Sequence, residues 1–327
     1  MNLRLYWLLF PLVTGGLFSC QSQQKPEPPA IKVIFDTDMG SDCDDAGALA
    51  LLHTFADANQ VEILACVYSS GKVPYGAAVV QAINRYYGRP QIAVGASHAD
   101  TAGDKKDKMQ AEKLARDTAA FGHTLIHNTD ATEQTRLNRQ VLVAQSDSSV
   151  IYITVGHTYG LYELLTSTPD DISTLTGHEL VSQKVKRWVA LGALGSKNKE
   201  GNYSRSWNFY RNGTAPFTEY LMQNWPVDAF FVDAGAKVLT GKSLKATPPG
   251  NIVRTAYRDW LWNTGQATLD DQRPSWDLAA VYFAILGSGE FLLPPEAGYM
   301  EFDAEKGALW HTEKQEGKRH FLVLQQP

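Results

Sequence analysis

Cysteine is scarce in this sequence, and clusters of basic residues are few. The 327-residue chain has three cysteines and no Cys-x-x-Cys pair, so we expect no thiolate metal site. Its formal net charge is −5, and no run of Lys and Arg interleaved with aromatic residues stands out beyond short segments. Without a basic field, nucleic acid is not an expected partner.

Long apolar runs are also missing, which argues against a membrane-spanning helix. The first apolar run, Leu5 to Phe18, is interrupted by Pro11 and two glycines and is too short for a comfortable span. Because Arg4 precedes it, the run is typical of a targeting segment. The whole composition, 44% hydrophobic and 20% charged, favours one large folded domain.

The apolar run ends in Leu17-Phe18-Ser19-Cys20, which resembles the lipobox of bacterial lipoproteins. The resemblance implies a signal peptide over residues 1–20 and a lipidated Cys20 at the mature N-terminus. A simple secretory signal with an incidental Cys is the alternative. Residues 21–31 are rich in Gln and Pro, as in a flexible tether.

Gln21, directly after the Cys, resembles the pattern that sorts lipoproteins to the outer membrane. We therefore expect an exported protein in the bacterial cell envelope, facing the periplasm and touching the membrane only through Cys20. In that compartment a disulfide between Cys43 and Cys66 is permitted without being required. A homo-oligomer is compatible with the sequence, which carries no direct sign of one.

Alternating strand and helix signals predict an α/β fold for residues 32–327. They favour a single doubly wound domain with a mostly parallel central sheet flanked by helices. Residues 97–137 interrupt the alternation and are predicted to be either a lid or a plain solvated insertion. The expected strands are 32–35, 61–68, 92–95, 150–155, 185–191 and 229–232. The expected helices are 46–55, 76–87, one ending near 144, one from 161 and an apolar one over 275–286.

Five aspartates crowd the junction between the first strand and the first helix, within Asp36 to Asp45. Open α/β sheets bind their ligands at such carboxyl ends of strands. Neighbouring carboxylates raise one another's pKa values in a partly buried site, and a bound cation removes this conflict. Only oxygen donors are present, which favours calcium over magnesium because calcium accepts irregular geometry. The alternative is an acidic helix start that is capped by Asp42 and otherwise solvated.

The segment from Asp36 to Ala46 contains Asp-x-Asp-x-Gly followed by Asp-Asp-Ala, and it resembles the signature of the inosine-uridine nucleoside hydrolase family. A second landmark is Ser275-Trp276-Asp277-Leu278-Ala279, which is similar to the family's late helix with a calcium-ligating Asp. The third, Val155-Gly156-His157-Thr158-Tyr159, stands where the family has a turn that gives calcium a backbone carbonyl. The likeness covers most of the chain from about Lys32 to Leu286.

The resemblance implies calcium-dependent hydrolysis of the N-glycosidic bond of a ribonucleoside or a related furanosyl compound. It assigns Asp38 as catalytic base and metal ligand, and Asp45 and Asp277 as further ligands. Tyr159 would ligate through its carbonyl, and Asp36 would support the loop. The loop is longer here than in the best-known members, so either Asp42 or Asp44 takes the role that contacts metal and sugar.

The substrate half departs from the family pattern. Asn208 matches a family Asn that binds ribose hydroxyls, but Ser206 replaces the accompanying Glu. Trp276 stands in place of a His that is thought to assist the leaving base. An indole can bind the substrate by stacking on a base or sugar, but it cannot donate a catalytic proton. Lys72 replaces an Asn that touches the sugar; it either contacts an anionic substrate group or is a solvated surface residue.

Two further sets of residues remain open. His157 either replaces the missing acid near the substrate or is a buried His hydrogen-bonded to nearby backbone. Four aromatic residues line the pocket or pack in the core: Tyr203, Trp207, Phe209 and Tyr210.

Two rival functions also remain. One is an envelope lipoprotein that keeps the metal and binds a sugar or nucleoside without hydrolysis. The other is a structural envelope protein, which requires the three landmarks to be coincidental.

Overall fold

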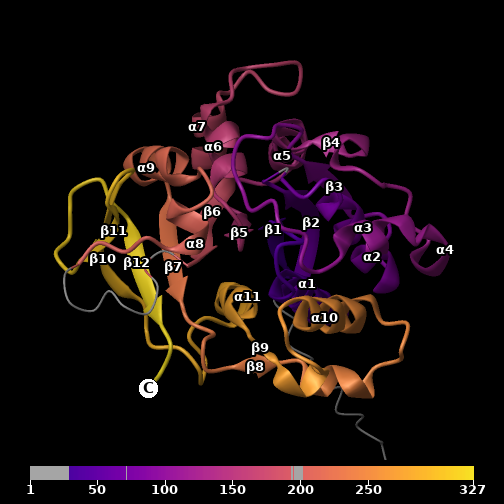
Figure 1. Cartoon of the computed structure of the whole chain (residues 1–327). Coiled ribbons are helices and arrows are strands. Elements are labelled where there is room, and N and C mark those ends of the chain that lie inside the picture. Colours follow the sequence, from indigo (N-terminus) through magenta and orange to yellow (C-terminus); the bar gives the residue numbers. More distant parts are fainter. Residues whose placement is uncertain (1–28, 71, 193, 195–201) are drawn as a thin grey trace, which may run out of the picture.

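A large twisted sheet forms the centre of the computed structural model, which describes residues 29–70, 72–192, 194 and 202–327 (Figure 1). The predicted signal peptide, Cys20 and most of the predicted tether lie outside these residues. The strand order of the sheet is β11-β10-β12-β7-β6-β5-β1-β2-β3-β4, and β8 pairs with β9 separately.

The strands of the main sheet are β1 (Ile31–Thr37), β2 (Val61–Tyr68), β3 (Ala93–Ala96), β4 (Thr132–Glu133), β5 (Val150–Thr154), β6 (Val185–Leu191), β7 (Asp228–Asp233), β10 (Glu296–Asp303), β11 (Gly307–His311) and β12 (His320–Leu324). The separate pair is β8 (Leu239–Thr240) and β9 (Arg273–Pro274). The α-helices are α1 (Asp44–Asp57), α2 (Gly76–Tyr86), α3 (Ala111–Arg116), α4 (Thr118–Phe121), α5 (Gln134–Val143), α6 (Tyr159–Thr166), α7 (Gly177–Lys184), α8 (Trp207–Tyr210), α9 (Ala215–Asn224), α10 (Ile252–Asn263) and α11 (Trp276–Leu286).

The order in which the chain adds strands to the sheet reverses beside β1. From β1 it adds β2, β3 and β4 on one side, and it then returns to place β5, β6, β7 and β12 on the other, all in parallel. Only β10 runs antiparallel to this set, and β11 pairs with it at the edge. The ends of β1 and β5 therefore form a topological switch point, where such sheets bind ligands.

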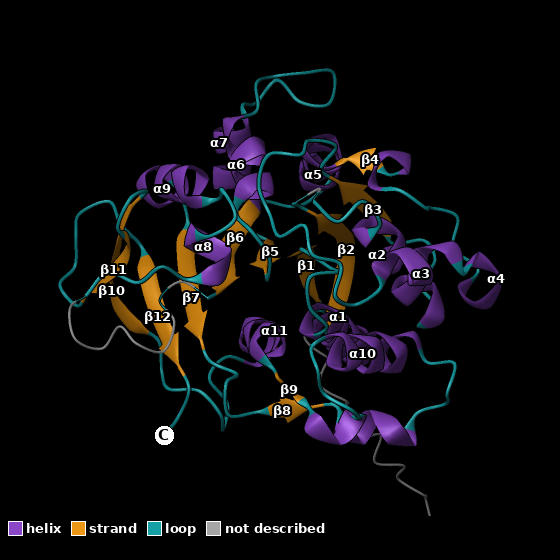
Figure 2. Ribbon diagram, viewed as in Figure 1, coloured by secondary structure: helices purple, strands orange, loops and turns teal. Residues whose placement is uncertain are grey.

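Each face of the sheet packs against its own set of helices (Figure 2). In β1, Val33 and Phe35 point into the core under α1, α2, α10 and α11, whereas Ile34 points into the core under α5, α6, α7 and α9. Side chains alternate along a strand, so a strand covered on both faces must be apolar at every position. The predicted α/β fold with a mostly parallel sheet is confirmed.

Residues 97–137 are not a plain solvated insertion. They contain α3, α4, β4 and the start of α5, and Met109 and Leu114 are buried. The backbone N–H groups of Lys108 and Met109 both donate to the carbonyl of Gly40, each at 3.1 Å. This segment therefore covers the acidic loop.

Two further expectations concern the membrane and the cysteines. In the described part of the chain, no helix combines the length and apolar character needed to cross a bilayer. Cys43 and Cys66 are buried free thiols, so this structure does not contain the disulfide that a periplasmic location permits.

His320 makes the fold sensitive to acid. Burial, followed by the charge of Lys318, lowers the pKa of His320 to about 4 from 6.5, and its Nδ1 accepts a 3.1 Å hydrogen bond from the Met300 N–H. Between these pH values the unfolded state binds more protons, so stability falls as pH falls from 6.5 to 4. The shift corresponds to about 3 kcal/mol.

The substitution His320→Gln should flatten the dependence of the free energy of unfolding on pH between 6.5 and 4, measured by urea denaturation. His178, which is exposed, supplies the control His178→Gln. Equal slopes in the wild-type protein and His320→Gln would contradict the assignment.

Candidate functional site

The acidic loop joins β1 to α1 at the switch point. It packs closely against the turn that follows β5. A Cβ atom on Gly156 would lie 2.6 Å from the backbone nitrogen of Asp38, so only glycine permits this approach. The two predicted landmarks around Asp38 and Gly156 are thereby in contact.

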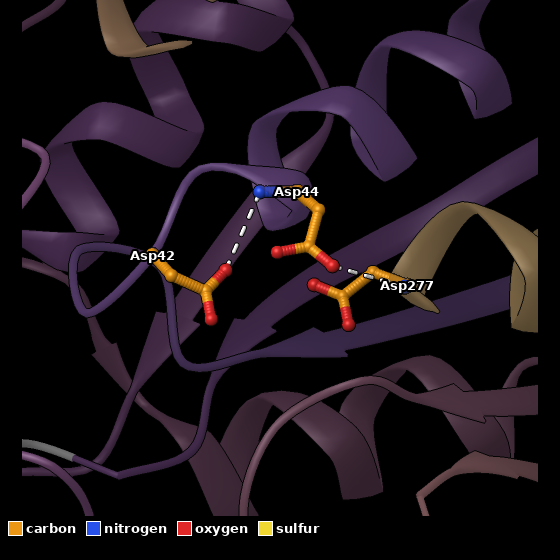
Figure 3. Close-up of side chains that lie close together, drawn as sticks. All are labelled: Asp42, Asp44 and Asp277. Atoms are coloured by element: carbon orange, nitrogen blue, oxygen red, sulfur yellow. Dashed lines mark hydrogen bonds between the residues drawn. The ribbon is translucent and has the colours of Figure 1, made fainter. Parts of the chain in front are cut away.

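Helix α11 brings the second landmark, with Asp277, to the same place (Figure 3). One carboxylate oxygen each from Asp42, Asp44 and Asp277 lie within 4.8 Å of one another. The backbone N–H of Asp277 donates to Asp44 Oδ2 and that of Asp44 donates to Asp42 Oδ1, each at 3.4 Å. The loop and the start of α11 are thus tied together through carboxylates.

Burial and mutual repulsion make these carboxylates difficult to ionise. Burial first, and then neighbouring carboxylates, raises the pKa values of Asp44, Asp45 and Asp277 well above the usual range. Asp277 is repelled by Asp44, Asp45, Asp42 and Asp38, in that order. All five side chains therefore belong to one electrostatic unit.

Behind this unit, Asp36 is fully buried. Burial first, and then repulsion by Asp38, raises its pKa, while hydrogen bonds from Ser69 and Tyr152 oppose the rise. Its Oδ1 atom has no hydrogen-bond partner among the described residues. Asp36 is held from the β5 side by the Tyr152 hydroxyl, and its supporting role for the loop stays a prediction.

Arg273 is a part of the site that the sequence reasoning missed. Its Nη2 donates to Asp42 Oδ2 at 2.6 Å, and its Nε donates to Asp44 Oδ1 at 3.1 Å. Burial opposes ionisation of Asp42, but Arg273 and hydrogen bonds involving Asp44 hold the Asp42 pKa below its usual value. Its place two residues before Ser275, where the second landmark begins, is the only sequence signal that could have drawn attention to it.

Several carboxylate oxygens remain available to a cation. Among the described residues, no hydrogen bond reaches either side-chain oxygen of Asp277, Oδ1 of Asp38 or Oδ2 of Asp45. The other Asp45 oxygen accepts from the Thr37 hydroxyl. Asp38 and Asp277 are only 6% and 5% exposed, so water cannot fully replace the missing hydrogen-bond donors. Buried carboxylates without donors form the oxygen-only set that suits a hard divalent cation.

His157 lies next to Asp38 and is completely buried. Its Nδ1 is 2.8 Å from Asp38 Oδ2, although the contact falls outside hydrogen-bond geometry. Its Nε2 lies 3.1 Å from the side-chain nitrogen of Asn212. Because an amide nitrogen only donates, Nε2 accepts, and the ring N–H is on Nδ1, facing Asp38. Its ring contacts two side chains and not the backbone that one alternative expected, and a role as an acid near the substrate stays a prediction.

Other predicted residues are distributed around the loop. Asn208, at the start of α8, donates to the carbonyl of Val155 at 2.6 Å. The Tyr159 hydroxyl donates to Glu163 at 2.5 Å, and the role of the Tyr159 carbonyl as a metal ligand stays a prediction. Lys72 is paired with Asp100 at 2.5 Å, so its charge is compensated within the chain.

The aromatic run does not form one surface. Phe209 is fully buried, and its ring lies 6.0 Å from Trp188 and 5.9 Å from Phe231, so it belongs to the core. Trp207 is 45% exposed. Tyr203 and Tyr210 donate hydrogen bonds to Glu301 and to the carbonyl of Glu305. Core packing therefore explains Phe209.

Solved structures with the same fold include nucleoside hydrolases. A plant nucleoside hydrolase matches with a TM-score of 0.63 and 16% identity, over 92% of this chain and 95% of the plant protein. The inosine-uridine preferring nucleoside hydrolase from Bacillus anthracis matches with a TM-score of 0.62 and 13% identity, over 90% and 93% of the two chains.

A structure described as an effector protein also has this fold. The type III effector protein XopQ, solved with adenosine diphosphate ribose, matches with a TM-score of 0.58 and 13% identity, over 84% of this chain and 86% of the effector. No protein-family model and no curated protein sequence matches the chain. The resemblance predicted from the three landmarks is confirmed for the fold: this chain has the fold of the nucleoside hydrolases.

Proposed function

We propose that the protein hydrolyses the N-glycosidic bond of a ribonucleoside or a related furanosyl compound and depends on calcium to do so. The observation that carries this proposal is the set of buried carboxylates at the switch point that have oxygens accepting no hydrogen bond from the described residues. Asp38, Asp45 and Asp277 contribute these oxygens, and the Tyr159 carbonyl completes the proposed ligand set. Bound calcium would lower the pKa of a coordinated water and hold sugar hydroxyls.

Asp38 is the proposed catalytic base. A water oxygen attacks the anomeric carbon while the C–N bond breaks, and Asp38 takes the proton that the water loses. The electron pair of the C–N bond leaves with the departing nucleobase. Asp38 is fixed for this role by the turn at Gly156 and by its contact with His157.

The sugar would be bound by Asp44 and Asn208, which lie near the metal ligands. Asp44 accepts from Arg273 and from the Asp277 N–H, so its two oxygens are held in a fixed orientation. No acid for the leaving base is assigned to this chain, and the substrate half of the site differs from the family pattern at Ser206, Trp276 and Lys72. Because one structure of this fold contains adenosine diphosphate ribose, ribosyl nucleotides belong in the substrate panel.

Metal-dependent binding of a sugar or nucleoside without hydrolysis is a second candidate. One observation favours it: Trp276, where the family has a His, has its ring 4.5 Å from the Arg273 guanidinium and carries no titratable proton.

For the location we propose an exported lipoprotein, anchored at Cys20 in the outer membrane and facing the periplasm. The support is the sequence from Arg4 to Gln21. The substitution Cys20→Ala should abolish incorporation of radiolabelled palmitate during expression in a bacterial host, whereas Cys43→Ala should retain it. Labelling of Cys20→Ala at the wild-type level would refute the anchor.

Calcium should stabilise the protein through Asp277. At a concentration a hundred times its Kd, a ligand adds about 2.7 kcal/mol, which raises the Tm by roughly 5 °C or more for a domain of this size. In Asp277→Asn this rise should shrink to less than about a third. In chelator, Asp277→Asn should melt no lower than the wild-type protein, because the substitution removes a repelled carboxylate.

Differential scanning fluorimetry with calcium and with chelator measures both effects. Asp57→Asn, at the exposed far end of α1, is the matched control. A full calcium response in Asp277→Asn would rule out Asp277 as a ligand.

Hydrolysis should be lost in Asp38→Ala. Removing a general base costs about 100-fold or more in rate. The assay measures release of free base or ribose from nucleosides, nucleotides, adenosine diphosphate ribose and related furanosides, with calcium and with chelator, using protein that lacks residues 1–20. Chelator-sensitive release by the wild-type protein and Asp57→Asn is expected.

Calcium-dependent binding without any release would instead establish the non-catalytic candidate. Release that persists undiminished in Asp38→Ala would remove Asp38 from its proposed role.

A further inference from the structure

The Arg273 guanidinium contacts four side chains of the protein. Its guanidinium lies 4.4 Å from the ring of Trp260 and 4.5 Å from the ring of Trp276, while its N–H groups donate to Asp42 and Asp44. The side chain is 15% exposed. A delocalised guanidinium stacks on aromatic rings and forks onto carboxylates, which a lysine ammonium or a hydrated ion does less well.

The elements that hold Arg273 are themselves tied to the acidic loop. The Trp260 indole N–H donates to the carbonyl of Ser41 at 3.2 Å, which connects α10 to the loop. The backbone of Arg273 pairs with Thr240 in the β8–β9 ladder. Arg273 is thus positioned by α10, β9 and α11 together, independently of the strands that carry the catalytic candidates.

We propose that Arg273 is the internal counter-cation of the acidic loop: it pairs Asp42 and Asp44 and leaves Asp38, Asp45 and Asp277 as the set that binds the metal. This inference rests on the proposed function for the identity of that metal. Asp42, Asp44 and Asp277 are close enough together to hold an ion, but two of these three already accept hydrogen bonds from the arginine.

Two consequences follow from this division of the carboxylates. First, the loop is ordered before any metal binds, since its extra negative charge at Asp42 is paired within the chain. Second, Arg273 reduces the affinity for calcium, because a fixed positive charge lies close to the metal ligands. Asp44 is held as an acceptor with its orientation set, which suits contact with sugar hydroxyls. Arg273 is therefore a positioning residue and not a catalytic one.

The test compares wild-type protein with Arg273→Gln and with the double variant Asp42→Asn/Arg273→Gln. In chelator, Arg273→Gln should melt roughly 5 °C or more below wild type, because it leaves buried carboxylates unpaired. The double variant should recover at least half of that loss, since it removes one of the two unpaired charges. Arg136→Gln, which removes an exposed arginine paired with the exposed carboxylate of Asp171, is the control and should melt close to wild type.

The second readout is the calcium affinity of the folded proteins, measured by isothermal titration calorimetry. Arg273→Gln should bind calcium at least about tenfold more tightly than wild type. Unchanged melting of Arg273→Gln in chelator, no recovery in the double variant, or equal or weaker calcium binding by Arg273→Gln would each overturn the proposal.

If Arg273→Gln does not fold, the double variant decides: a folded double variant supports the counter-cation role, and an unfolded one overturns it. The proposed function fails separately. Wild-type protein without any calcium response refutes calcium dependence, whereas the melting series in chelator still decides the role of Arg273.

Discussion

Repulsion between buried carboxylates is the constraint on which the rest of this structure depends. Asp38, Asp42, Asp44, Asp45 and Asp277 lie within one electrostatic unit, and burial makes each charge more costly than it would be in water. Cations that compensate the charge stabilise such an arrangement. The protein supplies one cation itself, at Arg273, and the unpaired oxygens of Asp38, Asp45 and Asp277 call for a second.

The fold makes this concentration of charge possible. The reversal of strand order beside β1 opens a crevice at the ends of β1 and β5, and the β5 turn approaches closely because Gly156 has no side chain. Helix α11 then adds Asp277 from a part of the chain more than two hundred residues away. A parallel sheet covered on both faces keeps these three segments in fixed relation.

The sequence predicted the alternation of strands and helices and the three landmarks because both are local patterns. Apolar runs and the Asp36 to Ala46 spacing are legible without knowledge of neighbours. The role of Arg273 could not be predicted from the sequence, since it depends on Trp260 and on a loop far away along the chain. The edge strands β10 to β12 and helix α10 were missed, and the lid-like segment 97–137 was only partly understood, for the same reason: tertiary contacts decide their place.

The fold does not by itself determine the reaction, since it occurs in nucleoside hydrolases and in an effector protein alike. The proposed reaction therefore depends on which oxygens bind the ion. A crystal structure of the protein grown with calcium tests this directly. It should show one ion at about 2.3–2.6 Å from oxygens of Asp38, Asp45, Asp277 and the Tyr159 carbonyl, with Arg273 still bound to Asp42 and Asp44. An ion held by Asp42 and Asp44 with Arg273 displaced, or crystals saturated with calcium that contain no ion at this site, would contradict it.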